Sequence, residues 1–205
     1  MKQRLFEYAL ENNPFRAFVR EWAEIKPLRE AIGIVALSHA LQIACGNGDS
    51  TRMLLKRFSP TSLSAVDKDQ ELIAEANERH ANKAITFSTQ DVRSLNFSDE
   101  QFDAVFDLSD LHNYRDWKIA LSELKRVLKR GGLLILEELS QETFARSTGR
   151  LFKILTEHPY DSLFTIESFR SRLLENGFEI LHFAERNPFS LLTYFTIIAK
   201  KTGGG

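Results

Sequence analysis

Short apolar segments alternate with longer amphipathic segments through the middle of this chain, and this alternation constrains the fold more than any other feature. The short segments have the composition of buried strands, and the segments between them repeat apolar residues at helical spacing. The predicted strands are residues 40–45, 62–66, 84–88, 102–106 and 132–136. Because strands that alternate with helices form parallel βαβ units, the pattern predicts an α/β fold built on a parallel sheet.

The helices expected in the same region have recognisable ends. Asp116 precedes a clean apolar face and is expected to cap a helix over residues 116–128. Gly131 and Gly132 are expected to end that helix, because glycine readily adopts the backbone conformation that follows a helix C-terminus. The other helices predicted after the first strand are residues 50–58, 71–81, 144–155 and 166–174.

The end of the chain departs from the alternation. Residues 178–183 and 191–199 are predicted as two strands, and the connection through Arg186-Asn187-Pro188 is too short for a crossover helix. These two strands must therefore run antiparallel. The complete prediction is a Rossmann-like, doubly wound, mostly parallel seven-stranded sheet that ends in an antiparallel hairpin, preceded by an N-terminal helical lid.

Composition limits the class of protein. The chain has 205 residues, 43% of them hydrophobic, which is enough for one core, so we expect a single domain over residues 1–202 and a tail over 203–205. A formal net charge of −1 argues against nucleic acid as a partner. The single cysteine excludes a disulfide within the chain, and no metal site is expected. Without a signal peptide or a membrane span, we expect a cytoplasmic protein.

Three groups of residues follow three successive predicted strands. The first strand ends in Ala44-Cys45-Gly46-Asn47-Gly48, the second in Asp67, and the third near Gln90-Asp91-Val92. Ligands of open α/β sheets bind at the carboxyl ends of the strands, where glycines allow close approach and a carboxylate can accept ribose hydroxyls. The order of the three groups therefore predicts a nucleoside-containing ligand.

With these motifs in place, residues 40–138 resemble the class I methyltransferases that use S-adenosylmethionine (SAM), and most of all the small-molecule enzymes of the ubiquinone and menaquinone C-methylation type. The resemblance extends beyond the glycine loop to three further segments. These are Phe102-Asp103-Ala104-Val105, Leu111-His112-Asn113-Tyr114-Arg115-Asp116-Trp117, and Leu121-Ser122-Glu123-Leu124-Lys125-Arg126-Val127-Leu128 followed by Lys129-Arg130-Gly131-Gly132.

The resemblance implies a division of the chain and a cofactor. Residues 1–35 would form the helical lid, 38–138 the SAM-binding core, 139–176 the substrate-side helices and 177–200 the terminal hairpin. It also implies the residues that hold SAM, namely Gln42, Ala44, Cys45, Gly46, Asn47, Gly48, Asp67, Lys68, Asp91, Val92, Asp107 and Leu108.

Within that set the resemblance implies separate roles. Asp67 would bind the ribose, with Lys68 over the adenine. Asp91 would accept the adenine amino group, and the Val92 N–H would reach a ring nitrogen. Asp107 and Leu108 would border the sulfonium and the substrate, while the glycine loop would hold the methionine portion.

The glycine loop departs from the family pattern at two positions. The family usually has an acid at Gln42 and glycine at Ala44, and each change is expected to weaken SAM binding by about 1 kcal/mol. Cys45 is expected to be a small buried residue rather than a nucleophile.

Catalytic and substrate residues are less clearly marked. His112 follows the fourth strand and could act as a general base, although a loop histidine that orders its own backbone is equally ordinary. Glu138 ends the fifth strand and could face the substrate or solvent. Tyr8 in the lid and His158 after the fifth strand are the other candidate substrate contacts.

The leading functional hypothesis is SAM-dependent methyl transfer to a small-molecule acceptor. The alternative is a non-catalytic protein of methyltransferase fold that binds SAM weakly or binds a protein partner, because of Gln42 and Ala44. A nicotinamide-dependent dehydrogenase fares worse, because Thr51 stands where its third glycine would fall. The substrate, the methyl-accepting atom and the oligomeric state stay open.

Overall fold

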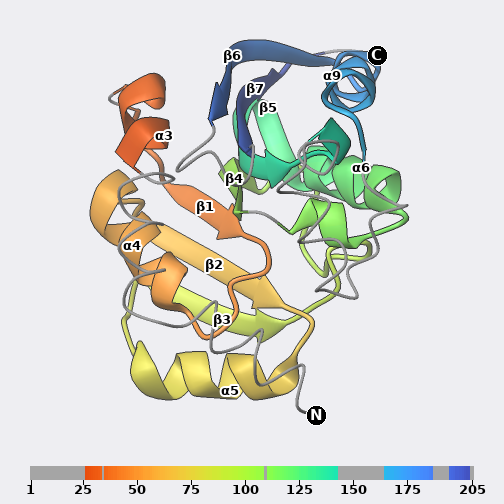
Figure 1. The fold of residues 1–205 in the computed structure, drawn as a ribbon. Helices are drawn as coiled ribbons and strands as arrows, with labels where there is room; N and C mark the ends of the chain where they lie inside the picture. Colours follow the sequence, from red (N-terminus) through yellow and green to blue (C-terminus); the bar gives the residue numbers. More distant parts are fainter. Residues whose placement is uncertain (1–25, 34, 109, 143–163, 187–193, 204–205) are drawn as a thin grey trace.

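The structure, a computed structural model, describes residues 26–33, 35–108, 110–142, 164–186 and 194–203. A seven-stranded sheet in the order β3-β2-β1-β4-β5-β7-β6 forms its centre (Figure 1). The strands are β1 (His39–Gln42), β2 (Ser62–Asp67), β3 (Ile85–Thr89), β4 (Phe102–Leu108), β5 (Leu128–Leu139), β6 (Phe178–Arg186) and β7 (Tyr194–Lys201).

The pairing of these strands confirms the predicted fold class. β1 to β5 pair in parallel, whereas β7 runs antiparallel to both β5 and β6. The order reverses at β1, which lies between β2 and β4, and this reversal creates a crevice at the carboxyl ends of the strands. Of the predicted lid, residues 1–25 and 34 lie outside the described residues, and so does the whole helix expected over residues 144–155.

Helices cover both faces of the sheet (Figure 1). One face packs against α6 (Trp117–Val127) and α9 (Ile166–Glu175), through Leu121, Leu124 and Phe169. The other face packs against α4 (Asp49–Phe58), with Ile32 of α3 (Lys26–Ile32) beside it. The remaining elements are α5 (Gln70–Arg79), which contacts β2 and β3, and the short 3-10 helix η2 (Leu111–Asn113).

The boundary between α6 and β5 differs from the prediction. The helix ends at Val127, and β5 begins at Leu128, before the two glycines. Gly131 has φ +76°, and the pairing of β5 with β4 shifts register between Phe102 and Ala104. The glycines therefore accommodate a bulge at the start of the strand instead of ending the helix. Asp116 holds the N-cap position of α6, but its side chain makes no capping hydrogen bond.

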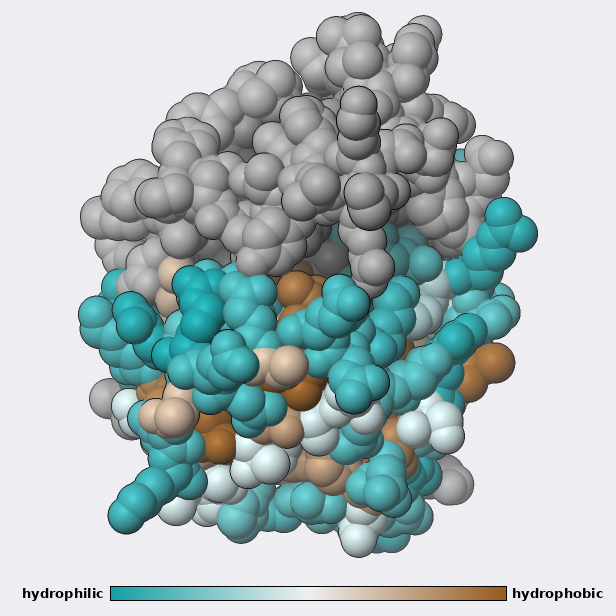
Figure 2. Space-filling model, turned by 90° about the horizontal axis from the view of Figure 1, so that it is seen from below, coloured by the Kyte–Doolittle hydropathy of each residue, from teal (hydrophilic) through white to brown (hydrophobic). Residues whose placement is uncertain are grey.

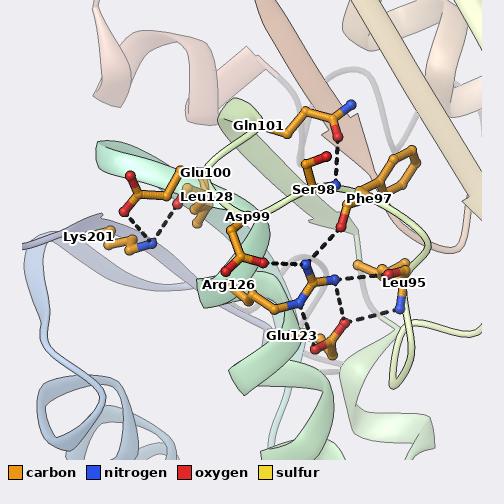
Figure 3. A network of polar contacts seen from close by, with 10 residues as sticks. All are labelled: Leu95, Phe97, Ser98, Asp99, Glu100, Gln101, Glu123, Arg126, Leu128 and Lys201. Carbon is orange, nitrogen blue, oxygen red and sulfur yellow. Dashed lines mark hydrogen bonds and ion pairs between the residues drawn. The ribbon is translucent and has the colours of Figure 1, made fainter.

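A group of charged residues, here called the Arg126 network, fastens the connection between β3 and β4 to α6 (Figure 3). The Arg126 guanidinium donates to the Asp99 carboxylate at 2.7 Å and to both carboxylate oxygens of Glu123. It also donates to the backbone carbonyls of Leu95 and Phe97. One side chain thus holds two carboxylates and two backbone carbonyls of the connection and the helix.

The described residues visible on one face of the molecule are mostly polar (Figure 2). Figure 2 shows one face on which hydrophilic residues dominate and apolar residues lie in small separate groups. Among the described residues, no helix has the length and apolar character needed to cross a membrane.

Candidate functional site

The loop after β1 is shaped by three residues with left-handed backbone conformations. Ala44, Gly46 and Gly48 have φ values of 47°, 54° and 85°. A Cβ atom on Gly48 would lie 2.7 Å from Cδ2 of His80 and 2.9 Å from Cζ of Phe87, so only glycine fits there. Ala44 adopts the same region with a methyl group, which strains its backbone. The strain explains why glycine is the usual residue at that position in the resembling family.

Asp67 ties this loop to the end of β2. Its Oδ2 accepts the Gly46 N–H at 2.9 Å, and its Oδ1 accepts the Asp69 N–H at 2.9 Å. Each carboxylate oxygen keeps a further lone pair for a ligand hydroxyl. A Cβ on Gly46 would meet nothing within 4 Å, so the backbone beside Asp67 is open to a ligand.

The other residues of the loop are packed. Burial raises the pKa of the Cys45 thiol, helped by repulsion from Asp67, and this fits a packing residue better than a nucleophile. Gln42 is fully buried, and its Nε2 donates to Oγ of Ser50 at 2.8 Å. Within the part of the chain that the structure describes, Oε1 of Gln42 has no hydrogen-bond partner. The amide nitrogen therefore makes a donor contact that the acid usual at this position in the family could not make when ionised.

A small cavity lies at the carboxyl ends of β1, β2 and β3. Its wall joins four of the predicted cofactor residues to four residues outside that set, and it consists of Ala44, Val66, Asp67, Lys68, Gln90, Val92, Asp110 and Tyr114. Lys68 reaches across it, because its Nζ lies 5.1 Å from the centre of the Tyr114 ring. Asp91, which was predicted to accept the adenine amino group, is not part of this wall. Both of its carboxylate oxygens accept hydrogen bonds from the Arg93 guanidinium.

The cavity has the parts that SAM requires. Its wall offers the backbone of Ala44, the Asp67 carboxylate with spare lone pairs, and the apolar side chains of Val66, Val92 and Tyr114. Negative groups nearby suit a ligand that carries an ammonium and a sulfonium. The residues present therefore fit the cofactor.

Those negative groups form a buried carboxylate cluster of Asp107, Asp110 and Glu138, at the carboxyl ends of β4 and β5. Burial raises the pKa of Asp107 well above its usual range, and the neighbouring Glu138 raises it further. Burial raises the pKa of Asp110 to about 7, with repulsion from Asp107 adding to the effect. Within the described part of the chain, Oδ2 of both aspartates lacks a hydrogen-bond partner. Burial and mutual repulsion therefore favour the protonated form of these carboxyl groups at neutral pH.

Glu138 and His112 form a hydrogen-bonded pair at the edge of this cluster. Oε2 of Glu138 lies 2.7 Å from Nδ1 of His112, and both side chains are buried. The sequence marked each residue separately as a candidate, but not their contact, because β5 and η2 are brought together only by the fold. Among the described residues, no group of side chains is arranged to hold a metal ion.

Some predicted site residues cannot be placed in this geometry. Tyr8 and His158 lie outside the described residues. Leu108 is half-buried at the end of β4, and Asn47 is buried, with its Oδ1 accepting the Asp49 N–H at 3.3 Å. Of the residues that the sequence reasoning missed, Asp110 and Tyr114 had a usable signal, because they lie within or beside the motif that begins at Leu111.

The central part of the chain matches a known protein family. A family model described as a methyltransferase domain matches residues 40–132, which run from β1 into β5. This segment contains the glycine loop, Asp67, the cavity and His112. This part of the chain is thus similar to a methyltransferase domain, and it includes the part of the sheet where the candidate site lies.

Curated relatives and solved structures agree with this assignment. The chain is 32% identical over 120 residues to demethylmenaquinone methyltransferase of Staphylococcus aureus, a match that covers 58% of this chain and 50% of that protein. It therefore spans about half the length of the curated relatives it matches.

Solved structures share the whole fold at low identity. A chain of a complex that contains the Haloferax volcanii Trm112 methyltransferase activator has a TM-score of 0.79 at 13% identity, over 100% of this chain and 98% of that one. A SAM-dependent methyltransferase from Aquifex aeolicus has a TM-score of 0.74 at 16% identity, over 96% and 98% of the two chains. These likenesses confirm the predicted fold.

Taken together, the matches confirm the predicted resemblance to class I SAM-dependent methyltransferases. The dehydrogenase hypothesis finds no support in them. The activity of the whole protein is a separate question, since only half of each curated relative is matched.

Proposed function

We propose that this protein transfers a methyl group from SAM to a small-molecule acceptor, as a cytoplasmic enzyme. One observation carries the proposal: the fold brings the strained glycine loop, Asp67 and Val92 from three adjacent strands into the wall of one cavity. Bound SAM supplies an electrophilic methyl group on a positively charged sulfur. The protein supplies the position of that methyl group and a buried environment for the transfer.

Each part of the cavity has a task in this proposal. Asp67 binds the ribose hydroxyls while it holds the glycine loop in place, and Lys68 and Tyr114 enclose the base. The carboxylate cluster compensates the positive charge of the ligand, because Asp107 and Asp110 each have an oxygen with no partner in the described residues. The name of the relative, demethylmenaquinone methyltransferase, makes a reduced naphthoquinone the first acceptor to try.

The test uses SAM with a labelled methyl group and 1,4-dihydroxynaphthalene as the acceptor probe. We expect labelled, organic-soluble product with the wild-type protein. Asp67→Ala should raise the Kd for S-adenosylhomocysteine (SAH) by about tenfold or more, on the scale of losing hydrogen bonds to a charged group.

The control is Asp103→Asn, because Asp103 lies at the opposite end of β4. Its carboxylate accepts two backbone N–H groups, from Ser38 and His39, and pairs with Lys129. This variant should lose stability and keep the wild-type Kd for SAH. Equal Kd values for Asp67→Ala and wild type would contradict the proposed site.

A further inference from the structure

A second cavity lies at the edge of the sheet opposite the cofactor cavity. It has a volume of about 490 Å³ and is bordered by the amino ends of β1, β4 and β5, by α3 beside β1, and by β6 and β7 (Figure 1). Asp103 lines it, and Asp107 lies on the same strand about 13 Å further along. The volume is within the range of small-molecule sites. A ligand bound here would therefore be separate from the methyl-transfer site.

One part of the wall of this second cavity is apolar. Leu37, Leu133 and Ile198 line it and belong to the core that packs on α4. Val35 and Leu181 also line it, and they are 40% and 52% exposed. They are two of the four large apolar side chains that are exposed among the described residues. A ligand with an apolar body would remove both from water, which is favourable.

Two β-bulges shape the wall. The pairing of β6 with β7 shifts register between Ile180 and His182, which leaves Leu181 without a partner. Ile180 and Phe183 pack on the core beside α9. Leu181 and His182 both line the cavity, although successive side chains of a regular strand point to opposite faces. The bulge at the start of β5 brings Gly131, with φ +76°, into the same wall.

The polar part of the wall carries more positive than negative charge. Among the described residues, the basic side chains of the wall are Lys129, Arg130 and Lys200, and the acidic one is Asp103. Oδ1 of Asp103 accepts from Nζ of Lys129 at 2.6 Å, and its Oδ2 accepts two backbone N–H groups. Asp103 and Lys129 therefore neutralise each other, and the charges of Arg130 and Lys200 remain.

These two cations differ in their surroundings. Arg130 pairs with Glu100 at 3.3 Å. Lys200 makes no ion pair with any described residue, and its Cε would lie 3.8 Å from a Cβ atom on Gly131, so its aliphatic chain runs beside the bulge. His182 adds a polar atom to the same wall, because its Nε2 is buried without a hydrogen-bond partner among the described residues. An acceptor on a ligand would satisfy both Lys200 and a protonated Nε2.

We propose that this second cavity binds a small amphipathic anion, namely a carboxylate carried on an apolar body. The carboxylate pairs with Lys200 and accepts from Nε2 of His182, while the apolar body packs against Val35, Leu37 and Leu181. One unpaired cation suits a single negative charge, and the apolar wall excludes strongly hydrated ions that have no hydrocarbon part. The inference goes beyond the proposed methyl transfer and does not depend on it.

The test uses decanoate, a carboxylate on an unbranched apolar chain, below its micelle-forming concentration. Calorimetric titration of wild-type protein should show one saturable site per chain, with the same Kd in the absence and presence of SAH. Decyltrimethylammonium and 1-decanol carry the same chain without the negative charge, and they should bind at least about tenfold more weakly. Added salt should weaken decanoate binding.

Matched variants locate the site. Lys200→Glu reverses the unpaired charge and should raise the Kd for decanoate by about tenfold or more. Leu181→Ser removes apolar contact and should raise it by about threefold to tenfold. The controls are Lys83→Glu and Leu174→Ser, which change an exposed lysine and an exposed leucine outside the wall and should keep the wild-type Kd. Lys200→Gln removes the charge without adding one and replaces Lys200→Glu if that variant does not fold.

The His182 ring gives a readout at the site itself. Protein labelled with nitrogen-15 at histidine is titrated with decanoate by NMR, and the His182 signals are assigned by their loss in His182→Gln. We expect these signals to move with the Kd found by calorimetry. The signals of His80, which lies beside Gly48 of the glycine loop, should stay in place.

Four results would overturn the proposal. The first is the absence of saturable decanoate binding to the wild type, including the case in which the protein binds phosphatidylglycerol vesicles instead, because the occupant would then be a membrane surface. The second is a wild-type Kd in the Lys200 variants. The third is decyltrimethylammonium binding as tight as that of decanoate. The fourth is competition between SAH and decanoate, which would place decanoate in the cofactor cavity.

Discussion

The carboxylates of the Arg126 network are paired with a cation, whereas those of the carboxylate cluster are buried beside one another. In the network, Glu123 and Asp99 face one guanidinium, and the hydrogen bond from Arg126 lowers the pKa of Glu123 (Figure 3). In the cluster, three carboxyl groups are buried together and burial raises the pKa of each. The first arrangement stabilises the fold. The second lowers its stability when its members ionise, and a cation bound beside it would favour that ionised form.

The largest effect is expected from removing one charge of the cluster. In the unfolded chain Asp110 ionises near its ordinary pKa of 3.8, whereas in the folded protein its pKa is about 7. The folded state therefore binds more protons between these values, and stability falls as pH rises from 4 to 7. The full difference corresponds to about 4 kcal/mol. Asp110→Asn should abolish this loss, as measured by urea unfolding at pH 4 and pH 8.

The same substitution should also weaken the binding of SAM more than the binding of SAH. Asp110→Asn leaves less negative charge at the cavity, so affinity for the cationic SAM should fall more than affinity for SAH, whose sulfur is neutral. The control is Asp116→Asn, an exposed carboxylate six residues away, which should leave the dependence of stability on pH as it is in the wild type. A curve for Asp110→Asn that follows the wild type at both pH values would contradict the account.

Breaking the Arg126 network should have the next largest effect on stability. It should destabilise the fold, whereas Asp110→Asn should stabilise it at neutral pH. Arg126→Ala removes hydrogen bonds to two carboxylates and two backbone carbonyls and should cost about 2–3 kcal/mol of unfolding free energy. The Kd for SAH should not change, because the network lies outside the cavity wall. Arg130→Ala is the matched control: this arginine is mostly exposed, and its pair with Glu100 is 3.3 Å long. It should change stability by less than about 0.5 kcal/mol.

The smallest effect is expected in the glycine loop. Ala44→Gly relieves a residue with φ 47° and should raise stability by about 0.5 kcal/mol, since the strain removed exceeds the extra entropy of the unfolded chain by little. It should also tighten SAH binding, as should Gln42→Glu combined with it. Ser59→Gly relieves the same φ of 47° at the end of α4, far from the cavity. A matching change in Kd for Ser59→Gly would show that the effect of Ala44 is not local.

Much of the fold and part of the candidate site could be predicted from the sequence. The order of apolar segments predicted the sheet and its antiparallel end, because hydrophobic periodicity and connection length are local properties. The glycine loop and Asp67 could be placed at one edge, since parallel strands end together. The glycine that the family usually has at position 44 marked Ala44 as a departure, but the expectation was weaker SAM binding and not the backbone strain that the structure shows.

The rest depends on contacts that no local pattern reveals. The hydrogen bond between Glu138 and His112 joins residues 26 positions apart, and its geometry follows from how η2 packs on β5. The bulge at Gly131 follows from the register of β5 against β4, so the glycines looked like a helix end. The pairing of Asp91 with Arg93 depends on side-chain geometry, which spacing alone does not fix.

The central claim is that the cavity at the carboxyl ends of β1 to β3 binds SAM, and calorimetric titration tests it most directly. Wild-type protein should bind both SAM and SAH with a saturable heat at one site per chain, and Asp67→Ala should weaken both by about tenfold or more while Asp103→Asn does not. Absence of heat with either ligand at high micromolar wild-type protein would contradict the claim.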